Sequence, residues 1–142
     1  MNASPPTTPP PVAKGTPPTT AAAPAPVVRP TLLLLEDDRA TSDGLIQLLR
    51  HYEFEVHLAR SLLEAMPLLP LIPRFAVLDL MLPDGGGERV LDLIRRRKLP
   101  TRVAMVTACR DRDRLTELVR LKPDAILAKP VDFLKLLEFL RA

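Results

Sequence analysis

Polar and charged side chains follow four short apolar runs of this sequence, at the point where each run ends. Asp79 closes the run that begins at Phe75, and a Pro/Gly-rich turn at residues 80–87 follows it directly. The other three groups are Glu36-Asp37-Asp38 after residues 32–35, Thr107 after residues 103–106, and Lys129 after residues 125–128. Carboxylates, a hydroxyl and an amine can together hold a divalent cation beside a phosphoryl group.

Glu36, Asp37 and Asp79 would place three carboxylates at one site, where they repel one another unless a cation lies among them. Ligation by oxygen alone suits Mg²⁺ or Mn²⁺. Metals that prefer imidazole are disfavoured, because His51 and His57 fall on a helix end and on a strand away from this edge. Taken alone, the acids at 36–38 could simply complement a helix N-terminus; together with Asp79 they favour a metal site.

An aspartate beside a metal can be a ligand or a nucleophile. Lys129 and Thr107 favour the nucleophile, because a phosphoryl group held covalently on Asp79 needs a cation and a hydrogen-bond donor for its oxygens. The Lys129-Pro130 bond is a candidate cis peptide that would aim the ammonium inward.

Short apolar segments alternate with segments of helical spacing throughout residues 31–142. The expected strands are 31–35, 54–59, 75–79, 102–106 and 124–128. This alternation predicts right-handed βαβ crossovers, and therefore a five-stranded parallel sheet with helices on both faces. In such a doubly wound α/β fold the ligand site lies beyond the carboxyl ends of the strands, where all four polar groups fall.

The helical segments differ in how clearly the sequence defines them. Ser61-Leu62-Leu63-Glu64 predicts a capping box that opens the second helix, which Pro67 and Pro70 must shorten or kink. Apolar faces are expected in three others: Thr41, Leu45, Leu48, Leu49 and Tyr52; Gly87, Val90, Leu91 and Ile94; Leu115, Leu118 and Val119.

The last helix, residues 131–140, is apolar nearly all round. Its expected buried face is Phe133, Leu136, Leu137 and Leu140, while Val131, Leu134 and Phe139 point elsewhere. Such a helix is buried on more than one side or covers a partner. We leave both explanations open.

Residues 1–30 form a Pro/Thr/Ala-rich tail that we expect to be disordered. They contain ten of the 17 prolines and no acid, and cannot bury enough surface to offset their ordering entropy. Tethering or solvation is the favoured role, with adaptor binding through Pro-x-x-Pro as the alternative. The sequence shows neither a signal peptide nor an 18-residue apolar stretch, so we expect no membrane partner.

The net charge of +3 is weak evidence for nucleic-acid binding. Because the tail holds Lys14 and Arg29, residues 31–142 carry 18 basic and 17 acidic residues. The densest basic run, residues 95–98, is expected at the solvated end of a helix, so we predict no direct nucleic-acid partner. Cys109 is the only cysteine, which fits a reducing, cytoplasmic location.

In this order, the motifs resemble the receiver domain of two-component response regulators over nearly all of residues 31–142. The matching pieces are Leu34-Leu35-Glu36-Asp37, Val77-Leu78-Asp79-Leu80-Met81-Leu82-Pro83, Gly87, Thr107-Ala108 and Lys129-Pro130. The resemblance implies a flavodoxin-like (CheY-like) domain that takes a phosphoryl group from a phosphohistidine onto Asp79. The donor would be a sensor histidine kinase or a histidine phosphotransfer protein.

The resemblance also implies the role of each residue. Glu36, Asp37, Asp79 and the Met81 backbone carbonyl would hold Mg²⁺, and Thr107 and Lys129 would sense the acyl phosphate. Phosphorylation would remodel the face built from the fourth helix, fifth strand and fifth helix, through which a downstream protein or a homodimer would bind.

One position departs from the family pattern, and two others are positions that set the phosphate lifetime in this family. Ile126 stands where the family commonly has a switch aromatic, so readout by an aromatic rotamer is in question. Met81 and Cys109 occupy positions that tune phosphate lifetime in this family. Neither can easily orient a water, so we predict slow self-dephosphorylation.

We weigh three functions for this chain. The first is a stand-alone phospho-accepting receiver that signals through a partner, since no output segment follows residue 142. The second is a phosphorylation-independent interaction module, for which Ile126 is the only support. The third is a haloacid-dehalogenase-like phosphatase, which would want an acid at the position of Met81. The sequence identifies neither the cognate kinase nor the target, and leaves the oligomeric state open.

Overall fold

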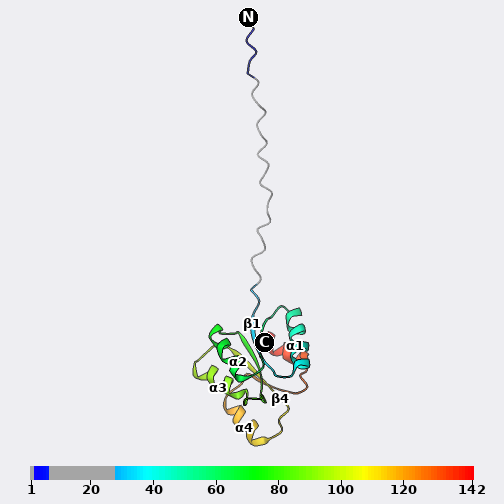
Figure 1. The fold of residues 1–142 in the computed structure, drawn as a ribbon, viewed down its shortest axis with the longest axis vertical. Coiled ribbons are helices and arrows are strands. Elements are labelled where there is room, and N and C mark those ends of the chain that lie inside the picture. Colours follow the sequence, from blue (N-terminus) through cyan, green and yellow to red (C-terminus); the bar gives the residue numbers. More distant parts are fainter. Residues whose placement is uncertain (1, 7–27) are drawn as a thin grey trace.

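The computed structural model describes residues 2–6 and 28–142, and most of the predicted tail lies outside these residues. Five parallel strands form one sheet in the order β2-β1-β3-β4-β5 (Figure 1). The strands are β1 (Thr31–Leu35), β2 (Glu55–Ala59), β3 (Phe75–Asp79), β4 (Arg102–Thr107) and β5 (Ala125–Ala128). The predicted α/β class with a five-stranded parallel sheet is therefore confirmed, with strand ends shifted by no more than one residue.

Helices cover both faces of this sheet. They are α1 (Arg39–His51), α2 (Leu62–Ala65) with the 3₁₀ turn η1 (Met66–Leu71), α3 (Glu88–Arg96), α4 (Arg112–Arg120) and α5 (Phe133–Arg141). In Figure 1, α1 and the red α5 lie together on one side, and α2 and α3 lie on the other. Right-handed crossovers that change direction after β2 produce this distribution.

Two apolar cores result, because successive side chains of a strand point to opposite faces. Leu33, Leu35 and Leu78 face α2, α3 and α4 and pack with Leu91 and Leu118. The alternate strand residues form the second core with α1 and α5: Leu32, Leu34, Phe75, Val77, Ala104 and Val106. Strands buried on both faces explain why these segments are continuous apolar runs.

The helix starts and stops follow their sequence signals. Ser61 accepts a hydrogen bond from the Glu64 amide at 3.1 Å, and the Glu64 carboxylate accepts one from the amide of Arg60 at 2.7 Å. The α-helical part of this segment ends at Ala65, immediately before the turn that contains Pro67 and Pro70. The prediction of a capped, shortened second helix is confirmed.

The buried faces of two helices differ from the expectation. On α1 the buried residues are Ser42, Leu45 and Leu49, whereas Leu48 and Tyr52 are exposed. The buried stripe of α1 is therefore narrower than the apolar spacing suggested.

On α5 the outward orientation expected for Phe139 is wrong. Its ring packs edge-on against Phe75, with ring centroids 6.2 Å apart. Val131 precedes the helix, which begins at Phe133. Leu134 is 69% exposed, so among the three residues expected to point away it is the one that faces outward from the helix.

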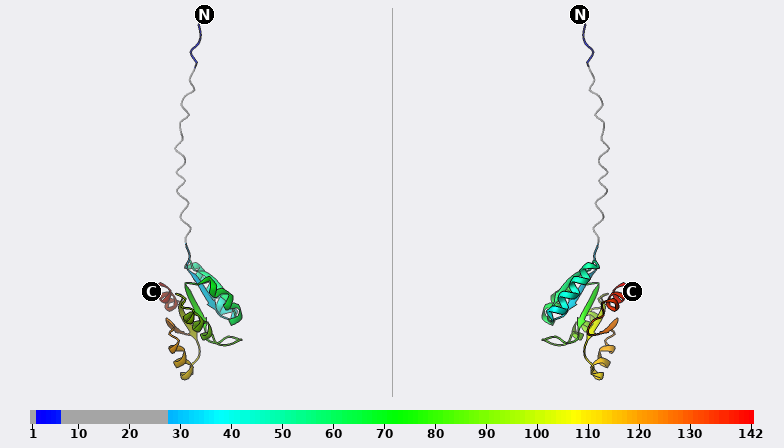
Figure 2. Two further views of the ribbon diagram at one scale, coloured as in Figure 1. Left: turned by 90° about the vertical axis from the view of Figure 1, so that its left-hand side faces the viewer. Right: turned by 90° about the vertical axis from the view of Figure 1, so that its right-hand side faces the viewer.

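The amino ends of the strands form the opposite edge of the sheet. Segment 28–30 enters the domain there, next to the start of β1 (Figure 2). At this edge Arg95 is not solvated as its basic run suggested. It donates to the carbonyl of Lys122 at 2.8 Å and to Asp124 at 2.9 Å. In the described part of the chain, no helix is long and apolar enough to cross a membrane.

Candidate functional site

Asp79 and Glu36 lie side by side at the carboxyl edge of the sheet, and both are buried. Asp79 ends β3, and Glu36 follows β1, the neighbouring strand. Lys129, which follows β5, reaches between them. Its Nζ lies 2.8 Å from Asp79 Oδ2 and 3.1 Å from Glu36 Oε2. The sheet therefore brings together three side chains that lie far apart in the sequence.

Asp37 completes a group of three carboxylates at this edge. One oxygen from each of Glu36, Asp37 and Asp79 lies within 4.8 Å of the other two. Asp37 is exposed, while the other two are buried, so the cluster opens to water on one side. This is the arrangement of oxygen ligands with open positions that Mg²⁺ prefers.

The electrostatics of the cluster favour a further cation. Burial and the nearby Asp79 charge raise the pKa of Glu36 above its usual value, and this rise is opposed by Lys129. Burial alone would lower the pKa of Lys129, but its hydrogen bonds and attraction to Asp79 and Glu36 raise it. One ammonium thus faces two buried carboxylates and a third nearby, which leaves negative charge for a divalent ion to offset. The residues present therefore fit Mg²⁺ or Mn²⁺.

Thr107 ends the strand next to that of Asp79, and Met81 lies on the loop that follows Asp79. Thr107 is the last residue of β4, and its Oγ1 accepts from the Cys109 amide at 2.8 Å. The Met81 amide donates to Asp79 Oδ1 at 3.1 Å, and the Met81 side chain is exposed. Lys129 is linked to Thr107 through the backbone, its amide donating to the Thr107 carbonyl at 3.0 Å. The peptide bond between Lys129 and Pro130 is cis.

Gly87 allows the β3–α3 loop to fold back onto Asp79. A Cβ at position 87 would collide with the backbone carbonyl oxygen of Asp79. The Gly87 amide donates to the Leu80 carbonyl at 3.1 Å, which closes the loop. Only a residue without a side chain fits at this approach.

Sequence reasoning missed two residues that hold this loop. Asp84 accepts from the amides of Leu62 and Leu63, at 2.9 and 3.1 Å, and so ties the loop to the start of α2. The hydrogen bond from Leu62, with that from Leu63, lowers the pKa of Asp84. Arg114 on α4 donates to the Leu80 carbonyl at 3.1 Å. A Pro-Asp-Gly turn hints at a polar role for Asp84, but nothing in the sequence distinguishes Arg114 from the other arginines among the seven at positions 95–114.

Ile126 and Cys109 lie outside this charged group. Ile126 is 40% exposed on β5, at the edge of the sheet, and Cys109 is half-buried and packs against the α2/α3/α4 core. Val119 on α4 and Leu134 on α5 are exposed as well. Each of α4, β5 and α5 therefore exposes an apolar side chain: Val119, Ile126 and Leu134 respectively.

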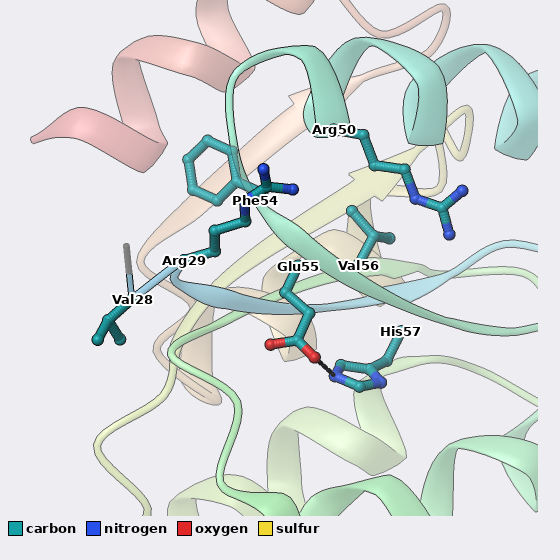
Figure 3. A pocket seen from close by; sticks show the side chains of 7 residues that line it. All are labelled: Val28, Arg29, Arg50, Phe54, Glu55, Val56 and His57. Atoms are coloured by element: carbon teal, nitrogen blue, oxygen red, sulfur yellow. Dashed lines mark ion pairs between the residues drawn. The ribbon is translucent and has the colours of Figure 1, made fainter. Parts of the chain in front are cut away.

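The described residues also form a shallow pocket where segment 28–30 and β2 meet (Figure 3). Arg29, Arg50 and Phe54 line it, and Glu55 lies 3.7 Å from His57, the contact dashed in Figure 3. The carboxylate of Glu55, the one acid that lines this pocket, faces His57 and not another acid. The three-carboxylate cluster and Lys129 are therefore the stronger candidate for chemistry.

The parallel sheet order, the two helix layers and the carboxylate cluster beyond the strand ends define a doubly wound α/β domain of the CheY-like type. A family model described as the response regulator receiver domain matches residues 32–141. The chain belongs to this family of two-component signalling domains.

Relatives and solved structures agree with the assignment. The acid tolerance regulatory protein ActR of Rhizobium meliloti is 34% identical over 103 residues, which cover 72% of this chain and 53% of ActR. A DNA-binding response regulator of the LuxR family from Staphylococcus aureus superposes with a TM-score of 0.73 at 26% identity, covering 79% of this chain and 96% of that one. The non-phosphorylated HemR receiver domain of Leptospira biflexa gives 0.72 at 27% identity, covering 80% and 92%. This chain thus spans about half the length of ActR.

Proposed function

We propose that this receiver domain accepts a phosphoryl group on Asp79 from the phosphohistidine of a sensor kinase or a histidine phosphotransfer protein. The observation that carries the proposal is the position of the Asp79 carboxylate. It is buried, 2.8 Å from the Lys129 ammonium and in one cluster with Glu36 and Asp37. A carboxylate so placed has a cation partner for the group it would receive.

In this reaction an Asp79 carboxylate oxygen attacks phosphorus and forms the O–P bond while the N–P bond of the phosphohistidine breaks. The electron pair of that bond stays on the imidazole nitrogen, which takes up a proton. Lys129 would pair with one phosphoryl oxygen, and the Thr107 hydroxyl would donate to another. Lys129 already contacts Asp79, and Thr107 ends the strand next to that of Asp79.

Glu36, Asp37, Asp79 and the Met81 backbone carbonyl are the proposed Mg²⁺ ligands. When bound, the ion would neutralise charge on the phosphoryl oxygens. This chain's own contribution is to keep Glu36 and Asp79 buried, with Asp37 at the open side. Burial and the Asp79 charge raise the pKa of Glu36, and the ion would offset the repulsion between these two carboxylates.

A groove beside Lys129 supports docking of the phosphohistidine donor at this edge. It runs between α1 and the β5–α5 loop, and is lined by Thr41, Leu48, Pro130 and Phe133 among others. Apolar side chains there suit one face of a helix that carries the histidine. Signal output would pass to a partner or a second copy through α4, β5 and α5.

The Asp79 phosphoryl group is expected to be long-lived. Met81 is exposed and Cys109 half-buried beside the site, and neither side chain carries a base or amide that could orient an attacking water. A half-life of seconds on the purified domain would contradict this.

The first test is intact-protein mass spectrometry after incubation with MgCl₂ and acetyl phosphate, with Asp79→Ala in parallel. We expect one added phosphoryl group on the wild type, and none on the variant or without Mg²⁺. A folded wild type that gains no adduct, even from an active histidine kinase, would overturn the proposal. It would favour the phosphorylation-independent module that Ile126 leaves open.

A further inference from the structure

One peptide group connects Asp79 directly to α4. The N–H of the Leu80–Met81 peptide donates to Asp79 Oδ1 at 3.1 Å. The carbonyl of the same peptide accepts from Arg114 Nη2 at 3.1 Å. Hydrogen bonds on the two sides of a peptide polarise each other, so a change at the Asp79 oxygen alters the acceptor strength of the carbonyl that Arg114 uses.

Arg114 has a second, longer hydrogen bond. The same Nη2 donates to Glu88 Oε1 at 3.5 Å, at the first turn of α3. The other carboxylate oxygen, Oε2, is the one buried side-chain polar atom without a hydrogen-bond partner in the described part of the chain. Because buried acceptors are normally satisfied, a guanidinium that left Leu80 for Glu88 would bring a donor to this unpartnered oxygen. The guanidinium therefore has a second acceptor to shift toward when its bond to Leu80 weakens.

Helix α4 is suited to respond to such a change. Leu118 is its one fully buried residue, and the rest of the helix is exposed or half-buried. Arg114 lies in the first turn of α4, three residues after the N-cap Asp111. A helix held by so few buried contacts depends strongly on each tie to the loop that carries Asp79.

We propose that Arg114 is a positioning residue that reports the state of Asp79 to α4 through the Leu80–Met81 peptide. The inference rests on the proposed function, since phosphorylation is the change of state. A phosphoryl group turns one Asp79 carboxylate oxygen into the bridging oxygen of an acyl phosphate and brings three further oxygens to the site. The peptide turns toward the new acceptors, so its carbonyl moves away from Arg114 and from the Gly87 amide, which also donates to it at 3.1 Å, and the guanidinium shifts toward Glu88. This route needs no aromatic side chain at position 126.

The test follows amide hydrogen exchange of residues 112–120 in the full chain, with MgCl₂ alone and with MgCl₂ plus acetyl phosphate. We expect the wild-type exchange rate there to change about fivefold or more on phosphorylation. Arg114→Gln should gain the same adduct by mass while its α4 exchange no longer responds. Arg114→Lys, which keeps a charged donor, should recover part of the response. Arg112→Gln is the matched control, because Arg112 lies on the same helix, is exposed, and its side chain makes no hydrogen bond or ion pair with the described residues.

An Arg114→Gln protein whose α4 exchange still responds like the wild type would overturn the inference. If the wild type gains no adduct, the proposed function fails instead, and Asp79→Asn tests the relay without phosphorylation. Replacing a carboxylate oxygen by an amide weakens or removes the acceptor of the Met81 N–H, so Asp79→Asn should change α4 exchange in the wild-type background and not in Arg114→Gln. Equal changes in both backgrounds would refute the relay.

Discussion

At the carboxyl ends of the strands several carboxylates lie close together, whereas at the amino ends one carboxylate has hydrogen-bond donors of its own. At the first edge Glu36 and Asp79 are buried and share Lys129. At the second edge Asp124 accepts from the Val103 amide at 2.7 Å and from Arg95 at 2.9 Å. Arg95 itself is shared with the carbonyls of Lys122 and Thr101.

The pKa shifts of the two edges have opposite signs. Burial and Asp79 raise the pKa of Glu36, so its charged form is disfavoured in the folded protein. Burial also acts to raise the pKa of Asp124, but the Val103 amide and Arg95 outweigh it and lower the pKa. One edge therefore tolerates repulsion that a ligand can relieve, and the other contributes to stability.

The largest expected effect is that of Asp79→Asn on phosphorylation. Adduct formation should fall by about 1,000-fold or more, because the nucleophile is gone. The free energy of unfolding without Mg²⁺ should stay equal or rise, by up to about 1 kcal/mol, since repulsion with Glu36 is relieved. Mass spectrometry and urea denaturation measure the two quantities. A strongly destabilised Asp79→Asn protein would show that the Asp79 carboxylate contributes to stability, against this expectation.

Gly87→Ala should be the most destabilising single change at the carboxyl edge. The new Cβ meets the Asp79 carbonyl, a backbone atom that cannot move aside, so we expect a loss of about 3 kcal/mol. Gly86→Ala is the matched control, because its Cβ meets only the movable end of the Glu88 side chain. Urea denaturation of both variants checks the difference, and equal losses would refute the explanation.

Magnesium should stabilise the protein through the carboxyl edge alone. At an Mg²⁺ concentration 100 times its Kd, we expect a gain of about 2.7 kcal/mol in the free energy of unfolding. Asp37→Asn should reduce this gain by weakening the ion's affinity, while Asp124→Asn should leave it unchanged. Thermal denaturation across an MgCl₂ titration measures it. A gain that survives in Asp37→Asn and Asp79→Asn would place the ion elsewhere.

Asp124→Asn should lower the free energy of unfolding by about 1–2 kcal/mol, a figure reduced because Asp124 and Arg95 are partly exposed. Phosphorylation by acetyl phosphate should continue at the wild-type rate, since Asp124 lies at the far edge of the sheet. Urea denaturation and adduct mass together test this separation. A slowed phosphorylation in the folded variant would mean that the two edges are coupled.

The smallest effect is a difference in pH dependence, measured without divalent ions. The lowered pKa of Asp124 means that its contribution to stability is present above the usual value of 3.8 and is lost as pH falls through the folded-state pKa. The raised pKa of Glu36 has the opposite sign: its ionisation destabilises, and this loss disappears as pH falls toward the usual value of 4.5.

Urea denaturation between pH 7 and pH 2 checks both signs. The stability difference between wild type and Asp124→Asn should shrink below about pH 3.8, and Glu36→Gln should gain over wild type as pH rises above about 4.5. If ionisation of both carboxyls changed the free energy of unfolding in the same direction, the contrast between the edges would be contradicted.

The alternation of apolar runs and helical spacing was enough to predict the sheet, its strands and the edge at which Asp79 lies. Backbone hydrogen bonding and burial on two faces impose these patterns locally, so they are visible in the residues themselves. The Ser61 cap and the shortened second helix were predictable for the same reason. The α1 face and the direction of Phe139 were not, because they depend on which neighbour a helix meets.

The sequence could mark Glu36, Asp37, Asp79, Thr107 and Lys129 as a set, because each follows an apolar run at a common edge. It could not mark Arg114 or Glu88, which lie on helices that only the tertiary fold brings together. Nor could it show that Arg95 is used inside the fold, at the carbonyls beside Asp124, while Arg97 and Lys98 remain exposed.

The sequence by itself determined the fold class, the family and the residues available for chemistry, since periodicity and strand-end polarity are properties of neighbouring residues. Only the tertiary structure decided which charges meet and at what distance. It places Lys129 2.8 Å from Asp79 and joins Arg114 to the peptide after Asp79. These contacts join residues 50 and 34 positions apart, and their geometry follows from how the sheet and helices pack, which no local pattern encodes.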